Sequence, residues 1–125
     1  MSKKIAPLLL AFFSALATHN IHADDIQRVR LFFGLSTPDD VVSAHDWEQF
    51  LEREIATTFA GFNVVDSLGY YRGKPERAKV VTVILPQKEI AKARAVAKAY
   101  AKKFNQESVM IVVIPVADWQ FIGGD

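Results

Sequence analysis

The order of two hydrophobic periods along the chain is the feature that most restricts its fold. Segments whose apolar residues alternate every second position, typical of strands, are interleaved with segments whose apolar residues recur every three or four positions, typical of helices. From residue 28 onward the order is strand, helix, strand, strand, helix, strand. It predicts an α+β fold of the ferredoxin-like kind, βαββαβ, with a four-stranded antiparallel sheet and two helices on one face.

The strand pattern also predicts where each strand lies in the sheet. We expect strands at residues 28–34, 62–72, 79–85 and 108–115. Right-handed crossovers place the first and third of these in the centre. The third is apolar on both faces, which is typical of a central strand, and the fourth is almost as apolar. Gly73 and Pro75 favour a turn between the second and third strands.

Two helices are predicted from the three-and-four spacing of their apolar residues. Ser43 and Asp46 nearly match a capping box, so the first helix is expected to begin there and to stop at Gly61. The second is expected to run from Pro86 to about Asn105. The first stripe consists of Trp47, Phe50, Leu51, Ile55 and Phe59, and the second of Ile90, Ala93, Ala97, Tyr100 and Phe104.

The N-terminal residues are typical of an export signal. Lys3 and Lys4 precede an apolar run of residues 5–17, which is shorter than the roughly 20 residues that span a bilayer. We expect residues 1–23 to be a secretory signal peptide cleaved between Ala23 and Asp24. An uncleaved anchor or a buried helix is the alternative. Residues 24–125 then form a single α+β domain in the periplasm or outside the cell.

Composition narrows the classes of function open to this domain. Loss of the two signal lysines changes the formal net charge from +1 to −1, so no basic surface predicts nucleic-acid binding. The chain has no cysteine, which excludes disulfides, thiolate metal sites and a lipid anchor. His45 is the one histidine left after cleavage. We therefore assign no catalytic residue, no metal site and no cofactor.

The second predicted helix carries a row of cations along one side. Arg94, Lys98 and Lys102 lie on one line of this helix. The helix is rich in alanine and lacks the aromatic residues that insert into a membrane surface. We interpret the row as a solvated outer face and expect no stable membrane anchor.

Polar residues are expected to meet at one end of the predicted sheet. The first and second strands run parallel in this topology, so the end of the first, the hairpin after the second and the start of the fourth share that end. The residues concerned are Ser36, Tyr71, Arg72, Gln106 and Glu107. They form either an Arg72–Glu107 ion pair beside a helix cap made by Asn105 and Gln106, or a ligand-binding site.

Four segments of the chain resemble a known family of exported bacterial proteins, domain of unknown function 3574. The residues that carry the resemblance are Leu31 to Ser36, Trp47 with Phe50 and Leu51, Asp66 to Arg72, and Tyr100 to Val109. The resemblance covers residues 28–115. The chain departs from the family pattern in having Tyr71 where tryptophan is usual, and in a shorter hairpin after Arg72. The resemblance implies export and a compact α+β domain, and it implies no activity.

An uncovered sheet face leads to two functional hypotheses. The predicted strands carry apolar residues on both faces, so the face without helices needs a cover. A homodimer is the expected solution. The alternative is a C-terminal segment with Trp119, Phe121 and Ile122 that folds back over the sheet. The first hypothesis is an exported, non-catalytic domain that binds a ligand or a protein. The alternative is a metal-free enzyme acting on a small apolar molecule inside the cavity of a dimeric α+β barrel, which depends on analogy of fold.

Overall fold

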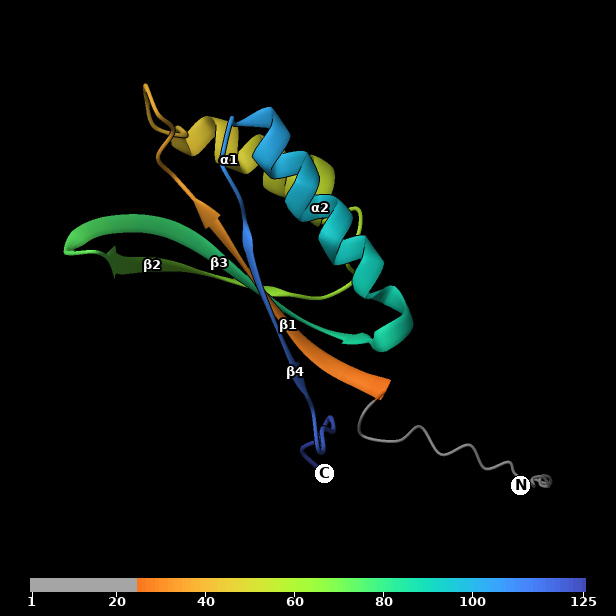
Figure 1. The fold of residues 1–125 in the computed structure, drawn as a ribbon. Helices are drawn as coiled ribbons and strands as arrows, with labels where there is room; N and C mark the ends of the chain where they lie inside the picture. Colours follow the sequence, from red (N-terminus) through yellow and green to blue (C-terminus); the bar gives the residue numbers. More distant parts are fainter. Residues whose placement is uncertain (1–24) are drawn as a thin grey trace.

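The computed structural model describes residues 25–125 (Figure 1). The predicted signal peptide and its cleavage point lie outside these residues. The elements in chain order are β1 (Ile26–Gly34), α1 (Ala44–Phe50), η2 (Leu51–Ile55), β2 (Asn63–Tyr71), β3 (Lys74–Pro86), η3 (Gln87–Glu89), α2 (Ile90–Lys103) and β4 (Met110–Pro115). The predicted α+β class is confirmed. Among residues 25–125 there is no candidate for a membrane-spanning helix.

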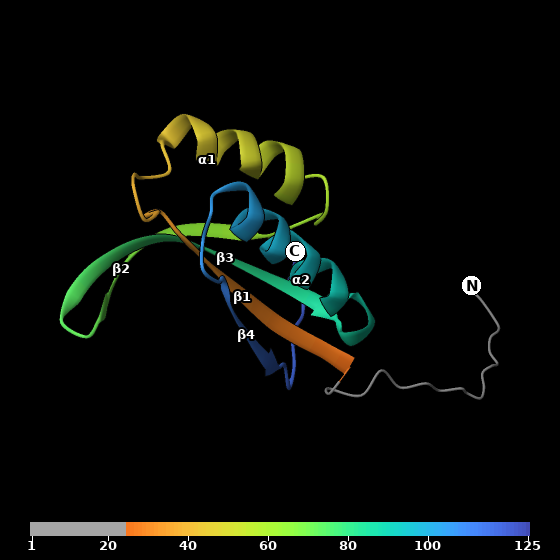
Figure 2. The same ribbon diagram turned by 45° about the horizontal axis from the view of Figure 1, so that its top comes forward.

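The four strands form one antiparallel sheet in the order β2-β3-β1-β4, so β1 and β3 are central as predicted. Leu31 of β1 pairs with Val81 of β3 on one side and with Ile111 of β4 on the other. Both helices cover the same face of the sheet (Figures 1 and 2). We call this the helix face and the opposite one the open face. Odd-numbered residues of β1 and β3 lie on the helix face.

The hairpin of β2 and β3 is longer than the sequence pattern predicts. β3 begins at Lys74 instead of residue 79, and its first residues pair with β2 alone. This first part of β3 lies beyond the helices and faces no core. Its residues therefore need no apolar alternation, which is why the sequence pattern does not predict it. Arg72 and Gly73 form the turn with φ of 52° and 79°, the left-handed values of a two-residue hairpin turn. Figure 1 shows this hairpin extending past the helices.

The first helix has the predicted start and an unpredicted widening. The Ser43 hydroxyl accepts a hydrogen bond of 3.0 Å from the Asp46 amide, which confirms the cap. After Phe50 the helix widens into the π-helical turn η2, where the Ala56 amide donates to the Leu51 carbonyl at 2.8 Å. This turn places Ile55, five residues after Phe50, in the core, while Leu51 is only partly buried.

An aromatic cluster forms the centre of the core between the helices and β1. The Tyr100 ring of α2 lies 4.7 Å from Phe33, 5.1 Å from Phe50 and 4.8 Å from Phe104 in centroid distance, mostly in tilted or edge-to-face contact. Trp47 of α1 packs against the same rings. Of the predicted stripe of α2, Phe104 is only partly buried, and Val96 is an additional buried residue.

Apolar residues also run across the open face. In one row, strand pairing aligns Val65 with Val80, Val80 with Phe32, and Phe32 with Met110. Val80 is buried beneath its neighbours, whereas Val65 and Met110 are 53% and 56% exposed. The Arg30 guanidinium lies 5.2 Å from the centroid of the Phe32 ring. No helix covers this face among residues 25–125 (Figure 2).

A candidate ligand-binding cleft

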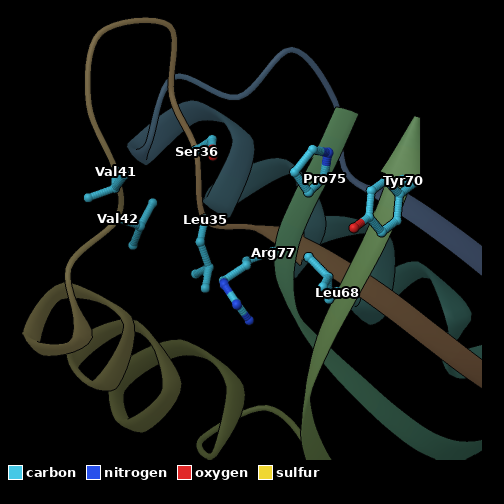
Figure 3. Close-up of a pocket in the computed structure, with 8 residues that line it drawn as sticks. All are labelled: Leu35, Ser36, Val41, Val42, Leu68, Tyr70, Pro75 and Arg77. Carbon is cyan, nitrogen blue, oxygen red and sulfur yellow. The ribbon is translucent and has the colours of Figure 1, made fainter. Parts of the chain in front are cut away.

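The loop that leaves β1 and the hairpin of β2 and β3 line an open cleft of about 590 Å³. It opens on the helix face, where the hairpin projects past α1. Most of its lining side chains are apolar, and Figure 3 shows their places on the two segments. The lining residues are Leu35, Ser36, Val41 and Val42 from the loop, and Leu68, Tyr70, Pro75 and Arg77 from the hairpin.

Hydrogen bonds within the loop fix the first wall of the cleft. The Val42 amide donates to the Leu35 carbonyl at 2.7 Å, and Ser36 and Val41 form an isolated antiparallel bridge. At the tip of the loop, the Thr37 amide donates to the Asp40 carbonyl at 2.8 Å. The Asp40 amide donates to the Thr37 hydroxyl, also at 2.8 Å. The loop is therefore a closed structure with defined positions for its side chains.

Two side chains attach this wall to the rest of the fold. Gln106 Nε2 donates to the Ser36 carbonyl at 2.7 Å, and the Tyr100 hydroxyl donates to the Gly34 carbonyl at 2.6 Å. Burial raises the pKa of the Tyr100 hydroxyl, so it remains a neutral donor throughout the physiological range. A Cβ on Gly34 would lie 3.0 Å from Gln106 Oε1, so a glycine lets this amide lie against β1.

The second wall is the helix-face side of the hairpin. Leu68 pairs with Arg77, and Tyr70 pairs with Pro75, so these four side chains share one face. The Leu35 amide donates to the Arg77 carbonyl at 3.0 Å, which joins the loop to the hairpin. A main-chain hydrogen bond thus connects the two walls and holds the loop beside the hairpin.

In the structure the five predicted site residues form two pairs and one separate residue. Ser36 and Gln106 come together, since the Gln106 amide holds the Ser36 carbonyl. Tyr71 directly follows Tyr70 and so faces the other side of the hairpin, where the Arg72 guanidinium lies 5.2 Å from the Tyr71 ring centroid. Glu107 precedes β4 at the same end of the sheet and is exposed. Within residues 25–125 no ion pair joins Arg72 to Glu107.

Helix capping accounts for one part of the predicted polar edge. Asn105 has φ of 51°, the left-handed conformation that commonly ends a helix. The Gln106 amide donates to the Ala101 carbonyl at 2.9 Å, which closes the end of α2. Gln106 therefore uses its main chain to end the helix and its side chain to position the cleft loop.

Sequence reasoning missed most of the cleft. The sequence pattern does not identify Leu68, Tyr70 and Arg77 as cleft residues, because their common face depends on the position of the hairpin turn. Strand alternation gives a signal that could identify two of them. Val64 faces the helices and Val65 faces the other way, so every second residue after Val64, including Leu68 and Tyr70, lies on the helix face. Arg77 follows once the turn is placed at Arg72 and Gly73.

The fold and the cleft together define a small α+β domain with a largely apolar cleft between a loop and a hairpin. The chain belongs to the family described as Protein of unknown function (DUF3574), whose model matches residues 28–120. This membership confirms the resemblance seen in the sequence. No curated protein is similar enough in sequence to count as a relative.

Solved structures share the fold at low sequence identity. A DUF3240 family protein from Shewanella baltica OS155 has a TM-score of 0.52 and 14% identity, with 79% of this chain and 98% of that chain covered. A phage SAM lyase in the apo state has a TM-score of 0.51 and 20% identity, with 83% and 98% covered. At these identities the likeness concerns the fold alone.

Proposed function

We propose that the mature chain is an exported, non-catalytic binding domain, and that its cleft binds a small molecule with a large apolar part. The preformed cleft carries this proposal, because hydrogen bonds from Gln106, Leu35 and the loop fix both walls. Its volume of about 590 Å³ falls in the range of roughly 300–1,000 Å³ found for small-molecule sites.

The polar groups of the cleft suit binding better than catalysis. They include the Ser36 and Tyr70 hydroxyls and the Arg77 guanidinium. His45, the histidine of residues 25–125, does not line the cleft, so the hydroxyls there have no imidazole base. The basic head and apolar run of residues 5–17 support export to the periplasm.

Blocking the cleft tests this function with a neutral apolar dye, N-phenyl-1-naphthylamine. Leu68 and Val65 lie on opposite faces of β2 and are 49% and 53% exposed, so they form a matched pair. We expect Leu68→Trp to abolish saturable dye fluorescence and Val65→Trp to leave it intact. Equal dye affinity in Leu68→Trp and the unmodified protein would contradict binding in the cleft.

We also propose that the open face forms a homodimer. The apolar row of Val65, Val80, Phe32 and Met110 crosses all four strands without a polar interruption. A second copy placed on this face would bury about 800 Å² per subunit, the area of a standard stable interface. Packing of two identical faces is the isologous contact of a twofold dimer.

Sedimentation equilibrium tests the dimer with one variant on each face. At about 100 µM we expect a dimer for the unmodified protein, because association depends on concentration. Met110→Lys places a charge in the apolar row and should give a monomer, while Leu68→Lys on the helix face should leave the dimer intact. A monomeric unmodified protein would contradict the proposal.

A further inference from the structure

We propose that the ligand of the cleft is an amphipathic anion, with an apolar chain against the loop and hairpin and an anionic group on Arg77. This inference depends on the proposed binding function and adds the chemical class of the ligand. It starts from the two cations that β3 carries on its helix face, Arg77 and Lys79, which lie two residues apart and have different surroundings.

Lys79 forms an ion pair with the residue opposite it on β2, whereas the residue opposite Arg77 carries no charge. Strand pairing places Asp66 opposite Lys79, and the two side chains form an ion pair. It places Leu68 opposite Arg77. Arg77 forms no ion pair with any carboxylate of the part of the chain that the structure describes. The Arg77 guanidinium is therefore available to bind an anionic group of a ligand.

The surroundings of Arg77 combine this charge with apolar surface. Figure 3 shows its side chain extending into the space between the loop and the hairpin, with Leu35 and Leu68 among the neighbouring lining residues. Arg77 is exposed, so its guanidinium is accessible to an anion that enters the cleft. An apolar chain on the same ligand would pack against Leu35 and Leu68 and remove their apolar surface from water.

The Tyr70 hydroxyl is a further donor in the cleft, and the nearby carboxylates have partners within the loop or face away from it. The Tyr70 hydroxyl points toward the cleft in Figure 3, so it can donate a hydrogen bond to the same ligand group. The acidic residue closest in sequence to the loop wall is Asp40, whose carboxylate accepts from the Val41 amide at 2.8 Å within the loop. Glu76 lies on the opposite face of the hairpin, since it neighbours Arg77 in the strand.

Displacement of N-phenyl-1-naphthylamine by octanoate and by octan-1-ol tests the inference. The two molecules share their chain and differ in the carboxylate. We expect octanoate to bind at least about tenfold more tightly at neutral pH, as a hydrogen bond to a charged group implies. Arg77→Gln should remove this preference and leave octan-1-ol binding unchanged. Arg77→Lys, which keeps the charge, should retain part of it.

Arg72→Gln is the matched control, because Arg72 is in the same hairpin with its guanidinium over Tyr71. It should bind octanoate as the unmodified protein does. Equal affinity for octanoate and octan-1-ol, or equal effects of Arg77→Gln and Arg72→Gln, would overturn the anion site while the binding function remains. Failure of both molecules and of the dye to bind would instead overturn the binding function itself.

Discussion

The two faces of the sheet contain similar numbers of apolar strand residues, yet they contribute differently to the molecule. On the helix face, Val29, Leu31 and Phe33 are fully buried under α1 and α2. On the open face, Phe32 is partly buried and Met110 largely exposed. Alternation along a strand therefore assigns residues to faces, and the helices decide which face becomes the core. The same division continues into the hairpin, where it separates the cleft from the Tyr71 side.

Two adjacent phenylalanines of β1 should differ most in their contribution to the free energy of unfolding. Phe33→Ala should lower the free energy of unfolding by about 3–5 kcal/mol, because it empties the centre of the aromatic cluster. Phe32→Ala on the open face should cost about 1–2 kcal/mol, since less apolar area leaves water there. Urea unfolding at about 1 µM, below the expected association range, provides the comparison. Equal losses would show that the open face is covered within the monomer.

Removal of the Tyr100 hydroxyl is expected to have a smaller effect, on stability and its pH dependence. Tyr100→Phe leaves the Gly34 carbonyl without this donor and should cost about 1–2 kcal/mol. Burial raises the pKa of Tyr100 above the unfolded value of about 10, so the folded state holds the proton more tightly. Its contribution is therefore complete below about pH 10 and is lost as the pH rises further. Urea unfolding between about pH 8 and 11 should show a shallower decline for Tyr100→Phe.

Gly34→Ala should loosen the cleft wall at a cost of about 1 kcal/mol, comparable to one hydrogen bond. The added Cβ would lie 3.0 Å from Gln106 Oε1 and displace the amide that holds the Ser36 carbonyl. Dye affinity should fall together with stability. Gly69→Ala is the control, because its Cβ would meet the Glu76 carbonyl at an ordinary 3.9 Å. Unchanged dye binding in Gly34→Ala would mean that Gln106 does not position the loop.

The smallest expected effect is a gain in stability at the hairpin turn. Arg72 adopts a left-handed φ of 52°, which asparagine tolerates better than arginine, and Asn-Gly is a favoured pair for such turns. Arg72→Asn should raise the free energy of unfolding by less than about 1 kcal/mol, as measured in urea. Loss of stability instead would show that the contact of Arg72 with the Tyr71 ring outweighs the backbone strain.

Part of the candidate site was predictable from the order of the elements. The proximity of Ser36 and Gln106 follows from placing the end of β1 near the start of β4, and the structure confirms this proximity. The contacts that join them were not predictable, because a side-chain amide and a main-chain carbonyl leave no periodic pattern. The contribution of Tyr100 was foreseen only as packing, and its hydrogen bond to Gly34 appears in the folded chain.

Local spacing and the handedness of crossovers are enough to predict the order of strands and helices, the central place of β1 and β3, the Ser43 cap and most of the buried stripes. The lining of the cleft depends instead on contacts between segments far apart in the chain. The two-residue turn at Arg72 and Gly73 sets the register of the hairpin. A shift of one residue would exchange the two faces and turn Arg77 away from the cleft.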